Sequence, residues 1–185
     1  MSPGSPGVPA TSGGSGDQAT AVRAVLSLGS NLGDRLAALQ GAVDALEEHD
    51  SVRIIAVSRV YETRPVGGPP QDPYLNAVVL IETTLRPGAV LELAQQIEEA
   101  YGRVRLERWG PRTLDVDVIV VDDIVSADPR LTLPHPRAHE RAFVLVPWLE
   151  IEPSAVVPGE GPVAELLSGL DTSGVALLST GLVRL

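Results

Sequence analysis

The stretch Arg108-Trp109-Gly110-Pro111-Arg112-Thr113-Leu114-Asp115-Val116-Asp117-Val118-Ile119-Val120-Val121 places two carboxylates at the start of an apolar run. Four consecutive apolar residues are typical of a central strand that is buried on both faces. Side chains two residues apart on a strand share one face, so Asp115 and Asp117 point the same way from positions about 7 Å apart. Two like charges held there repel unless a cation lies near both. The stretch therefore predicts a buried strand that begins at a metal site.

The residues around the carboxylates favour magnesium and phosphate. Mg²⁺ prefers oxygen ligands, takes one or two protein carboxylates and completes its coordination with water and substrate phosphates. Arg108 and Arg112 carry planar guanidinium groups that match phosphate oxygens. The alternative is a polar strand end with solvated ion pairs, because the Asp-x-Asp pattern is short and common. The flanking Trp, Gly, Pro and Arg residues favour phosphoryl chemistry.

Composition limits the class of protein. The chain has 185 residues, of which 44% are hydrophobic, and this is enough for one domain with a substantial core. It has no cysteine, which excludes disulfides and thiolate metal sites. The formal charge of −10 argues against general nucleic-acid binding. All 14 basic residues are arginines, several of them close to the carboxylates, so any basic site is local.

The chain shows no targeting or membrane segment. No apolar run approaches the roughly 18 residues that a membrane-spanning helix needs, and the N-terminus lacks the layout of a signal peptide. We therefore expect a cytoplasmic protein that has no membrane partner. Residues 1–20 consist mainly of Gly, Ser, Pro and Thr, which predicts a disordered extension, and residues 21–185 are expected to form a single domain.

The order of the expected elements indicates the fold class. They are a strand over 21–28, a turn over 29–34 in which Asn31 or Asp34 caps a helix, strand-like runs over 51–63 and 75–85, a helix from Pro87 to Gly102, and the strand with the carboxylates. This βαββαβ order predicts an α+β fold with a ferredoxin-like core, in which two helices cover one face of a mainly antiparallel sheet. Two further helices, near 137–143 and 163–170, are expected to cover the other face as C-terminal additions and complete a three-layer α/β/α sandwich.

Four motifs resemble one enzyme family. They are Leu28–Asp34, Tyr61–Thr63 followed by Tyr74–Ala77, Arg108–Asp117, and Leu131–Phe143. Over about residues 24–151 the chain is similar to the 6-hydroxymethyl-7,8-dihydropterin pyrophosphokinases of folate biosynthesis. The resemblance implies that the pterin hydroxyl attacks the β-phosphorus of ATP and that AMP leaves. It also implies a monomer whose partners are these two small molecules.

The same resemblance implies the catalytic residues. Asp115 and Asp117 would hold two Mg²⁺ ions that bridge the phosphates of ATP, the co-substrate. Arg112 is the first choice for an arginine that stabilises the transition state. Arg103 is the second, with Arg105 as an alternative, because the segment from Gly102 to Trp109 is one residue shorter here than in some relatives.

Two binding sets follow by resemblance. The pterin would be bound by Thr63, Val66, Tyr74, Asn76 and Phe143. ATP would be bound by Glu98, Arg108, Trp109, Arg130, Leu131, Thr132, His135 and Arg141. Without the resemblance, Tyr74 and Phe143 would be interpreted as core residues and His135 as a residue that fixes a loop. We expect no role for His49 and His139, and a solvated turn at Asp122 and Asp123.

Two other functions stay open at this stage. One is a different Mg²⁺-dependent nucleotide hydrolase or transferase that shares the metal strand but lacks the pterin pocket. The other is a ferredoxin-like module that senses nucleotide or metal, or that binds RNA through its sheet. An aromatic content of 3% and the acidic charge weigh against RNA.

Overall fold

A computed structural model describes residues 20–64, 71–101 and 113–182. Within these ranges the chain forms strands, α-helices and one short 3₁₀ helix. In chain order they are β1 (Val22–Ser30), α1 (Arg35–Glu47), β2 (Val52–Val57), β3 (Tyr61–Thr63), β4 (Tyr74–Thr83), α2 (Pro87–Ala100), β5 (Asp115–Val121), β6 (Ser126–Asp128), β7 (Leu131–Leu133), η1 (Ala138–Glu140), α3 (Ala142–Ile151), β8 (Val156–Val157), β9 (Gly161–Pro162), α4 (Val163–Ser168) and β10 (Val175–Leu177).

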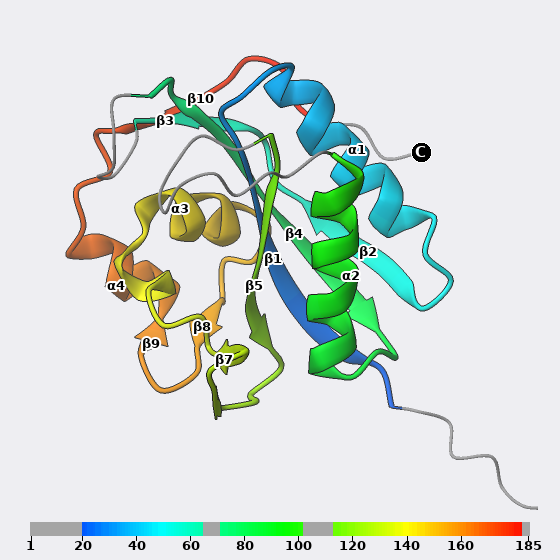
Figure 1. Cartoon of the computed structure of the whole chain (residues 1–185). Coiled ribbons are helices and arrows are strands. Elements are labelled where there is room, and N and C mark those ends of the chain that lie inside the picture. The colour runs from blue at the N-terminus through cyan, green and yellow to red at the C-terminus, as the bar shows by residue number, and fades with distance from the viewer. Residues whose placement is uncertain (1–19, 65–70, 102–112, 183–185) are drawn as a thin grey trace, which may run out of the picture.

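Six strands form one antiparallel sheet in the order β10-β3-β4-β1-β5, and β2 also pairs with β4. The strands β1 and β4 lie in its interior (Figure 1). They are apolar along most of their length, as expected for strands buried on both faces. Two small hairpins, β6-β7 and β8-β9, lie outside this sheet.

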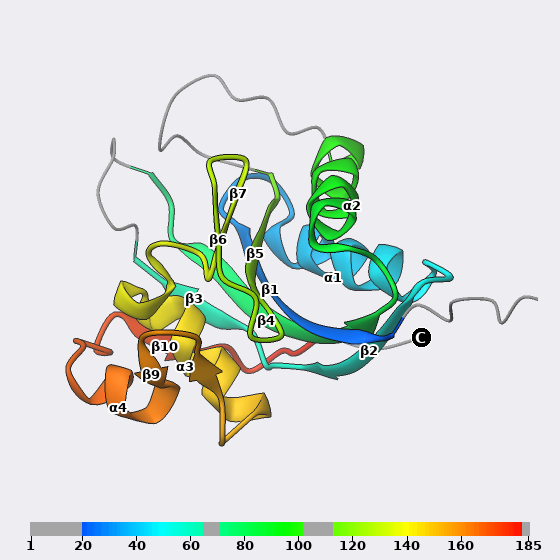
Figure 2. The ribbon, with the colours of Figure 1, turned by 90° about the horizontal axis from the view of Figure 1, so that it is seen from below.

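Helices cover both faces of the sheet (Figure 2). Alternate residues of β1 show the division. Ala24, Leu26 and Leu28 pack into a core with α1 and α2, whereas Val25 packs into a second core with α3 and residues of α4. The prediction of helices on both faces of an antiparallel sheet is therefore confirmed. The helix expected near 137–143 was placed wrongly, because that stretch holds only the short η1 and the start of α3, and the helix that covers the second face is α3 over 142–151.

Two strands differ from the sequence expectation because of pairing across the sheet. The strand β1 does not end at Leu28, since Gly29 and Ser30 pair with Asn76 and Leu75 of β4. The run over 51–63 is two strands rather than one. The break occurs at buried Ser58, whose hydroxyl accepts a hydrogen bond from the backbone N–H of Val78 at 2.9 Å.

The start of α1 follows one of the two predicted alternatives. Asp34 is the N-cap, and its Oδ1 accepts a hydrogen bond from the backbone N–H of Ala37 at 3.0 Å. Asn31 does not cap the helix. Its side chain donates to Gln71 and to the carbonyl of Asp72. The turn before α1 is thus bound to the segment that leads into β4.

The side chain of Tyr101 packs against α1 at Gly41. A Cβ built at Gly41 of α1 would overlap the phenol of Tyr101, which follows α2. We expect Gly41→Ala to destabilise the protein by about 1–3 kcal/mol through overpacking, although alanine gains about 1 kcal/mol in helix propensity. Urea denaturation would measure this.

The control for that prediction is a second glycine. A Cβ at exposed Gly88 of α2 meets no atom within 4 Å, so Gly88→Ala should not destabilise the protein. Combining Gly41→Ala with Tyr101→Ala should cost less than the sum of the two single changes. A Gly41→Ala protein as stable as the wild type would show that Tyr101 moves aside freely.

Candidate active site

Asn76 and the two carboxylates lie at the same end of the sheet, where β1 ends and where β4 and β5 begin. The register places Tyr61, Asn76, Gly29 and Asp115 opposite one another in a row across β3, β4, β1 and β5. Residues paired in this way point to the same face of a sheet. Asn76 and Asp115 therefore share a face, about 10 Å apart across two strand spacings, with Gly29 between them.

The carboxylates belong to that same face. Asp115 and Asp117 are half-buried, while Val116 between them points into the core under α1 and α2. Asp117 Oδ2 accepts a hydrogen bond from Arg141 Nη1 at 3.2 Å, and His135 Nε2 lies 4.0 Å from it. The structure thus brings together four residues predicted from two separate motifs.

The protonation of His135 follows from its contacts. Its Nδ1 accepts a hydrogen bond from the backbone N–H of Arg137 at 3.2 Å, so the neutral ring carries its proton on Nε2, which faces Asp117. Burial lowers the pKa of His135, and the nearby guanidinium of Arg141 lowers it further, while Asp117 acts in the opposite direction. A neutral His135 offers an N–H donor without adding a positive charge.

The donor set fits magnesium that is shared with a nucleotide. No group of three or more His, Asp or Glu side chains placed to hold a metal occurs in the described residues. The two carboxylates of β5 leave the other coordination positions to water and phosphate, as Mg²⁺ prefers. Arg141 beside them adds a cation that can contact the same phosphates.

Three of the predicted pterin residues, Thr63, Tyr74 and Asn76, lie next to one another on β3 and β4, and Phe143 lies on α3. Asn76 and Thr63 are buried, and Asn76 Nδ2 donates a hydrogen bond to Thr63 Oγ1 at 2.6 Å. Tyr74 lies two residues before Asn76 on the same face of β4. Phe143 is half-buried, and the guanidinium carbon of Arg141 lies 5.6 Å from its ring centroid. Arg141 thus contacts both the aromatic ring and Asp117.

Glu98, predicted to bind ATP, has a structural contact that the sequence did not indicate. Its side chain is buried on α2, and Oε1 accepts a hydrogen bond from the backbone N–H of Val116 at 2.8 Å. Because Val116 separates the two aspartates, this bond ties the start of β5 to α2 between them. Glu98 can therefore position the carboxylates.

Replacing Glu98 separates this positioning role from contact with ATP. In Glu98→Leu the N–H of Val116 stays buried without its acceptor, so we expect a loss of about 1–3 kcal/mol in the free energy of unfolding and a fall in kcat. Glu98→Gln keeps an acceptor and should approach wild-type values. Thermal denaturation and steady-state kinetics measure both. Two results together would contradict the positioning role: normal stability of Glu98→Leu, and a KM for ATP that is raised in both Glu98→Leu and Glu98→Gln.

Three of the predicted ATP residues belong to the β6-β7 hairpin. Arg130 is exposed and pairs with Asp128 at 3.0 Å, which lowers the pKa of that carboxyl group. Thr132 Oγ1 donates to the carbonyl of Asp128, and Leu131 packs against the core under α2. The hairpin adjoins both α2 and β5, although the side chain of Arg130 is held within the hairpin itself.

Other predictions have simpler outcomes. Asp122 and Asp123 are exposed in a turn after β5, as expected, and Asp122 Oδ1 accepts a hydrogen bond from the N–H of Arg23. His49 Nδ1 accepts from the N–H of Ser51 in a turn, away from the site. Several predicted residues lie outside the described residues: Val66, Arg103, Arg105, Arg108, Trp109 and Arg112.

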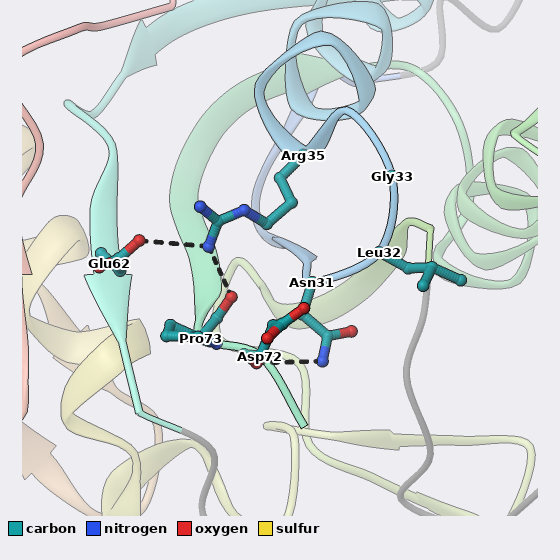
Figure 3. A pocket seen from close by; sticks show the side chains of 7 residues that line it. All are labelled: Asn31, Leu32, Gly33, Arg35, Glu62, Asp72 and Pro73. Carbon is teal, nitrogen blue, oxygen red and sulfur yellow. Dashed lines mark hydrogen bonds and ion pairs between the residues drawn. The ribbon is translucent and has the colours of Figure 1, made fainter. Parts of the chain in front are cut away.

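Arg35 is a site-supporting residue that the sequence analysis missed. Its Nη1 donates to Glu62 Oε2 at 3.2 Å and to the carbonyl of Pro73 at 2.7 Å, so it joins the residues next to Thr63 and Tyr74. Figure 3 shows Arg35 between β3 and Pro73, beside a hollow of about 250 Å³. Arg35 begins α1, and a cation in the first turn of a helix opposes the helix dipole. This unfavourable position is the sequence feature that could have pointed to a role for Arg35.

Comparison with known proteins agrees with this geometry. Residues 25–153 match the family model of 7,8-dihydro-6-hydroxymethylpterin-pyrophosphokinase. Proteins named 2-amino-4-hydroxy-6-hydroxymethyldihydropteridine pyrophosphokinase include one from Methylorubrum extorquens, 50% identical over 83% of this chain and 96% of its own length. Another, from Mycobacterium tuberculosis, is 45% identical over 80% of this chain and 84% of its own length.

Solved structures of Plasmodium falciparum HPPK-DHPS share the fold. The wild type with pterin and p-hydroxybenzoate has a TM-score of 0.62 at 14% identity, over 83% of this chain and 42% of that chain. A triple mutant with pteroate has a TM-score of 0.65 at 16% identity, over 83% of this chain and 44% of that chain. This chain thus spans less than half of those longer chains. By the family match and the close relatives, the chain belongs to the 7,8-dihydro-6-hydroxymethylpterin-pyrophosphokinase family and is a diphosphotransferase.

Proposed function

We infer that this chain transfers the pyrophosphoryl group of ATP to 6-hydroxymethyl-7,8-dihydropterin, which yields AMP and the pterin diphosphate in folate biosynthesis. One observation carries the inference from geometry to function. Asn76, which can recognise a heterocycle edge, and Asp115, which can bind a metal, share one face of the sheet two strands apart. That distance of about 10 Å suits a two-ring acceptor whose alcohol arm reaches the phosphates.

We propose that Asp115 and Asp117 together hold two Mg²⁺ ions with the phosphates of ATP. When bound, the ions neutralise phosphate charge and fix the β-phosphorus for in-line attack. Arg141 and the N–H of His135, both beside Asp117, would contact the phosphate oxygens on the same side. Arg112 and Arg103 stay predicted catalytic residues, with Arg105 as the alternative to Arg103.

The acceptor side uses hydrogen bonding and stacking. The Asn76 amide has both a donor and an acceptor, and its bond to Thr63 fixes the orientation of the amide plane. Tyr74, two residues away on the same face of β4, and Phe143 of α3 would supply ring faces that suit a flat heteroaromatic ligand. The pterin oxygen then forms its bond to the β-phosphorus as the bond from that phosphorus to the AMP oxygen breaks, so catalysis rests on positioning and charge neutralisation.

Several finer assignments stay predictions. We assign the core to the ferredoxin-like class, and the strand order β5-β1-β4 with β2 and β3 beyond β4 supports this. None of the described helices has the length and hydrophobicity of a membrane span. We propose a monomer with a single domain over 21–185, a cytoplasmic location and no nucleic-acid partner.

Product analysis tests the proposed reaction. With ATP, Mg²⁺ and 6-hydroxymethyl-7,8-dihydropterin, mass spectrometry should detect a pterin that has gained two phosphoryl groups, together with an equal amount of AMP. A singly phosphorylated pterin together with ADP would contradict the transfer of pyrophosphate.

A further inference from the structure

The face of β1 that points to the site is lined by progressively smaller residues. Val25, Ser27 and Gly29 lie on this face in order toward the site. Val25 packs under α3, buried Ser27 lies opposite Val78 and Asp117, and Gly29 lies opposite Asn76 and Asp115. The smallest of these residues, Gly29, therefore lies between Asn76 on one side and Asp115 on the other.

A side chain at position 29 would enter that intervening space. A Cβ built on Gly29 lies 3.3 Å from Asn76 Oδ1, and 3.9 Å from both Asp115 Cβ and Tyr74 Cδ1. The backbone of Gly29 pairs with both neighbouring strands without a left-handed conformation. Chain geometry thus does not require glycine here. A side chain there would instead have to displace the amide oxygen of Asn76 by a few tenths of an ångström.

We propose that Gly29 is a specificity-determining position, whose bare backbone forms the floor on which the acceptor ring lies between Asn76 and the carboxylates. The inference rests on the proposed function, because it takes the flat pterin as the occupant of this space. A methyl group there would lift the ring from the strand and crowd the amide of Asn76. Binding of ATP with Mg²⁺ draws on Asp117, Arg141 and His135, none of which is among the three nearest contacts of that methyl group. The methyl group would meet Asp115, the other carboxylate, only at an ordinary van der Waals distance of 3.9 Å from its Cβ.

Gly29→Ala tests the proposal by separating the two substrates. We expect KM for the pterin to rise at least tenfold, while the dissociation constant for the ATP analogue AMPCPP with Mg²⁺ stays within twofold of the wild type. Gly88→Ala on exposed α2 is the matched control and should change neither value. An unchanged pterin KM, an equal loss of both ligands, or a variant that does not fold would overturn the proposal.

A second measurement uses the absence of cysteine from the chain. Gly29→Cys introduces a unique thiol, which should react with methyl methanethiosulfonate and be protected by the pterin but not by AMPCPP with Mg²⁺. The Gly88→Cys thiol should react at the same rate with or without pterin. A Gly29→Cys thiol that is inert in the folded protein, or that pterin does not protect, would overturn the proposal. A failure of the proposed reaction is distinct, because it would appear as a wild type that makes no pterin diphosphate.

Discussion

Asp117→Ala is expected to lower kcat by about 10³-fold or more, because it removes both a proposed metal ligand and the carboxylate that Arg141 contacts. The loss of one ligand should also raise the Mg²⁺ concentration that gives half-maximal activity. Initial rates of AMP formation over a Mg²⁺ titration would measure both effects. The variant should remain folded, since Asp117 is half-buried near the start of β5 and belongs to neither hydrophobic core.

Two control variants sharpen that prediction. Asp123→Ala removes a carboxylate from the exposed turn at the other end of the same strand, and it should keep wild-type kinetics. Asp117→Asn keeps the shape of the side chain but not its charge, and it should be nearly as inactive as Asp117→Ala. Activity of the Asn variant close to wild type would show that Asp117 holds Arg141 by shape rather than serving a metal.

Asn76→Ala is expected to lower kcat/KM for the pterin by up to about 10²-fold and to leave binding of ATP analogues unchanged. The amide is buried and bonded to Thr63, so its removal leaves polar groups of both the protein and the ligand without partners, at about 1–3 kcal/mol. Steady-state kinetics at saturating ATP would measure the effect. Isothermal titration calorimetry with AMPCPP and Mg²⁺ would show whether the dissociation constant for the nucleotide is unchanged.

The control for Asn76 lies on the same strand. Thr83, at the far end of β4, is equally buried, and its hydroxyl donates to the carbonyl of Ser51 at 2.6 Å. Thr83→Val should lower the free energy of unfolding through the lost hydrogen bond but leave the pterin KM unchanged. If Thr83→Val raised that KM as much as Asn76→Ala does, the effect of Asn76 would be one of strand stability.

The sequence predicted the elements of the fold better than their contacts. The apolar run after Asp117 and the helical spacing around Leu39 and Val43 are local patterns, and each led to an element that the structure contains. The short edge strand β10 was not predicted. It is three residues long and mostly exposed, and it exists because it pairs with β3.

For the site, the carboxylate pair could be proposed from local spacing alone, whereas the positions of its neighbours depend on tertiary contacts. From the sequence, Gly29 was interpreted as a turn residue. Its place in β1 depends on pairing with β4 and β5, which lie far from it in the sequence. The bond from Glu98 to Val116 and the double contact of Arg35 join separate elements in the same way. Neither contact has a periodicity that a sequence pattern can reveal.

The central claim is that one face of the sheet joins a pterin site to a metal-nucleotide site so that each needs the other for turnover. AMP release from ATP and Mg²⁺, with and without 6-hydroxymethyl-7,8-dihydropterin, tests it most directly in the wild type, Asp117→Ala and Asn76→Ala. We predict AMP only when the pterin is present, and strongly reduced AMP in both variants. AMP or ADP released at the same rate without the pterin would contradict the claim and indicate a nucleotide hydrolase with a different acceptor.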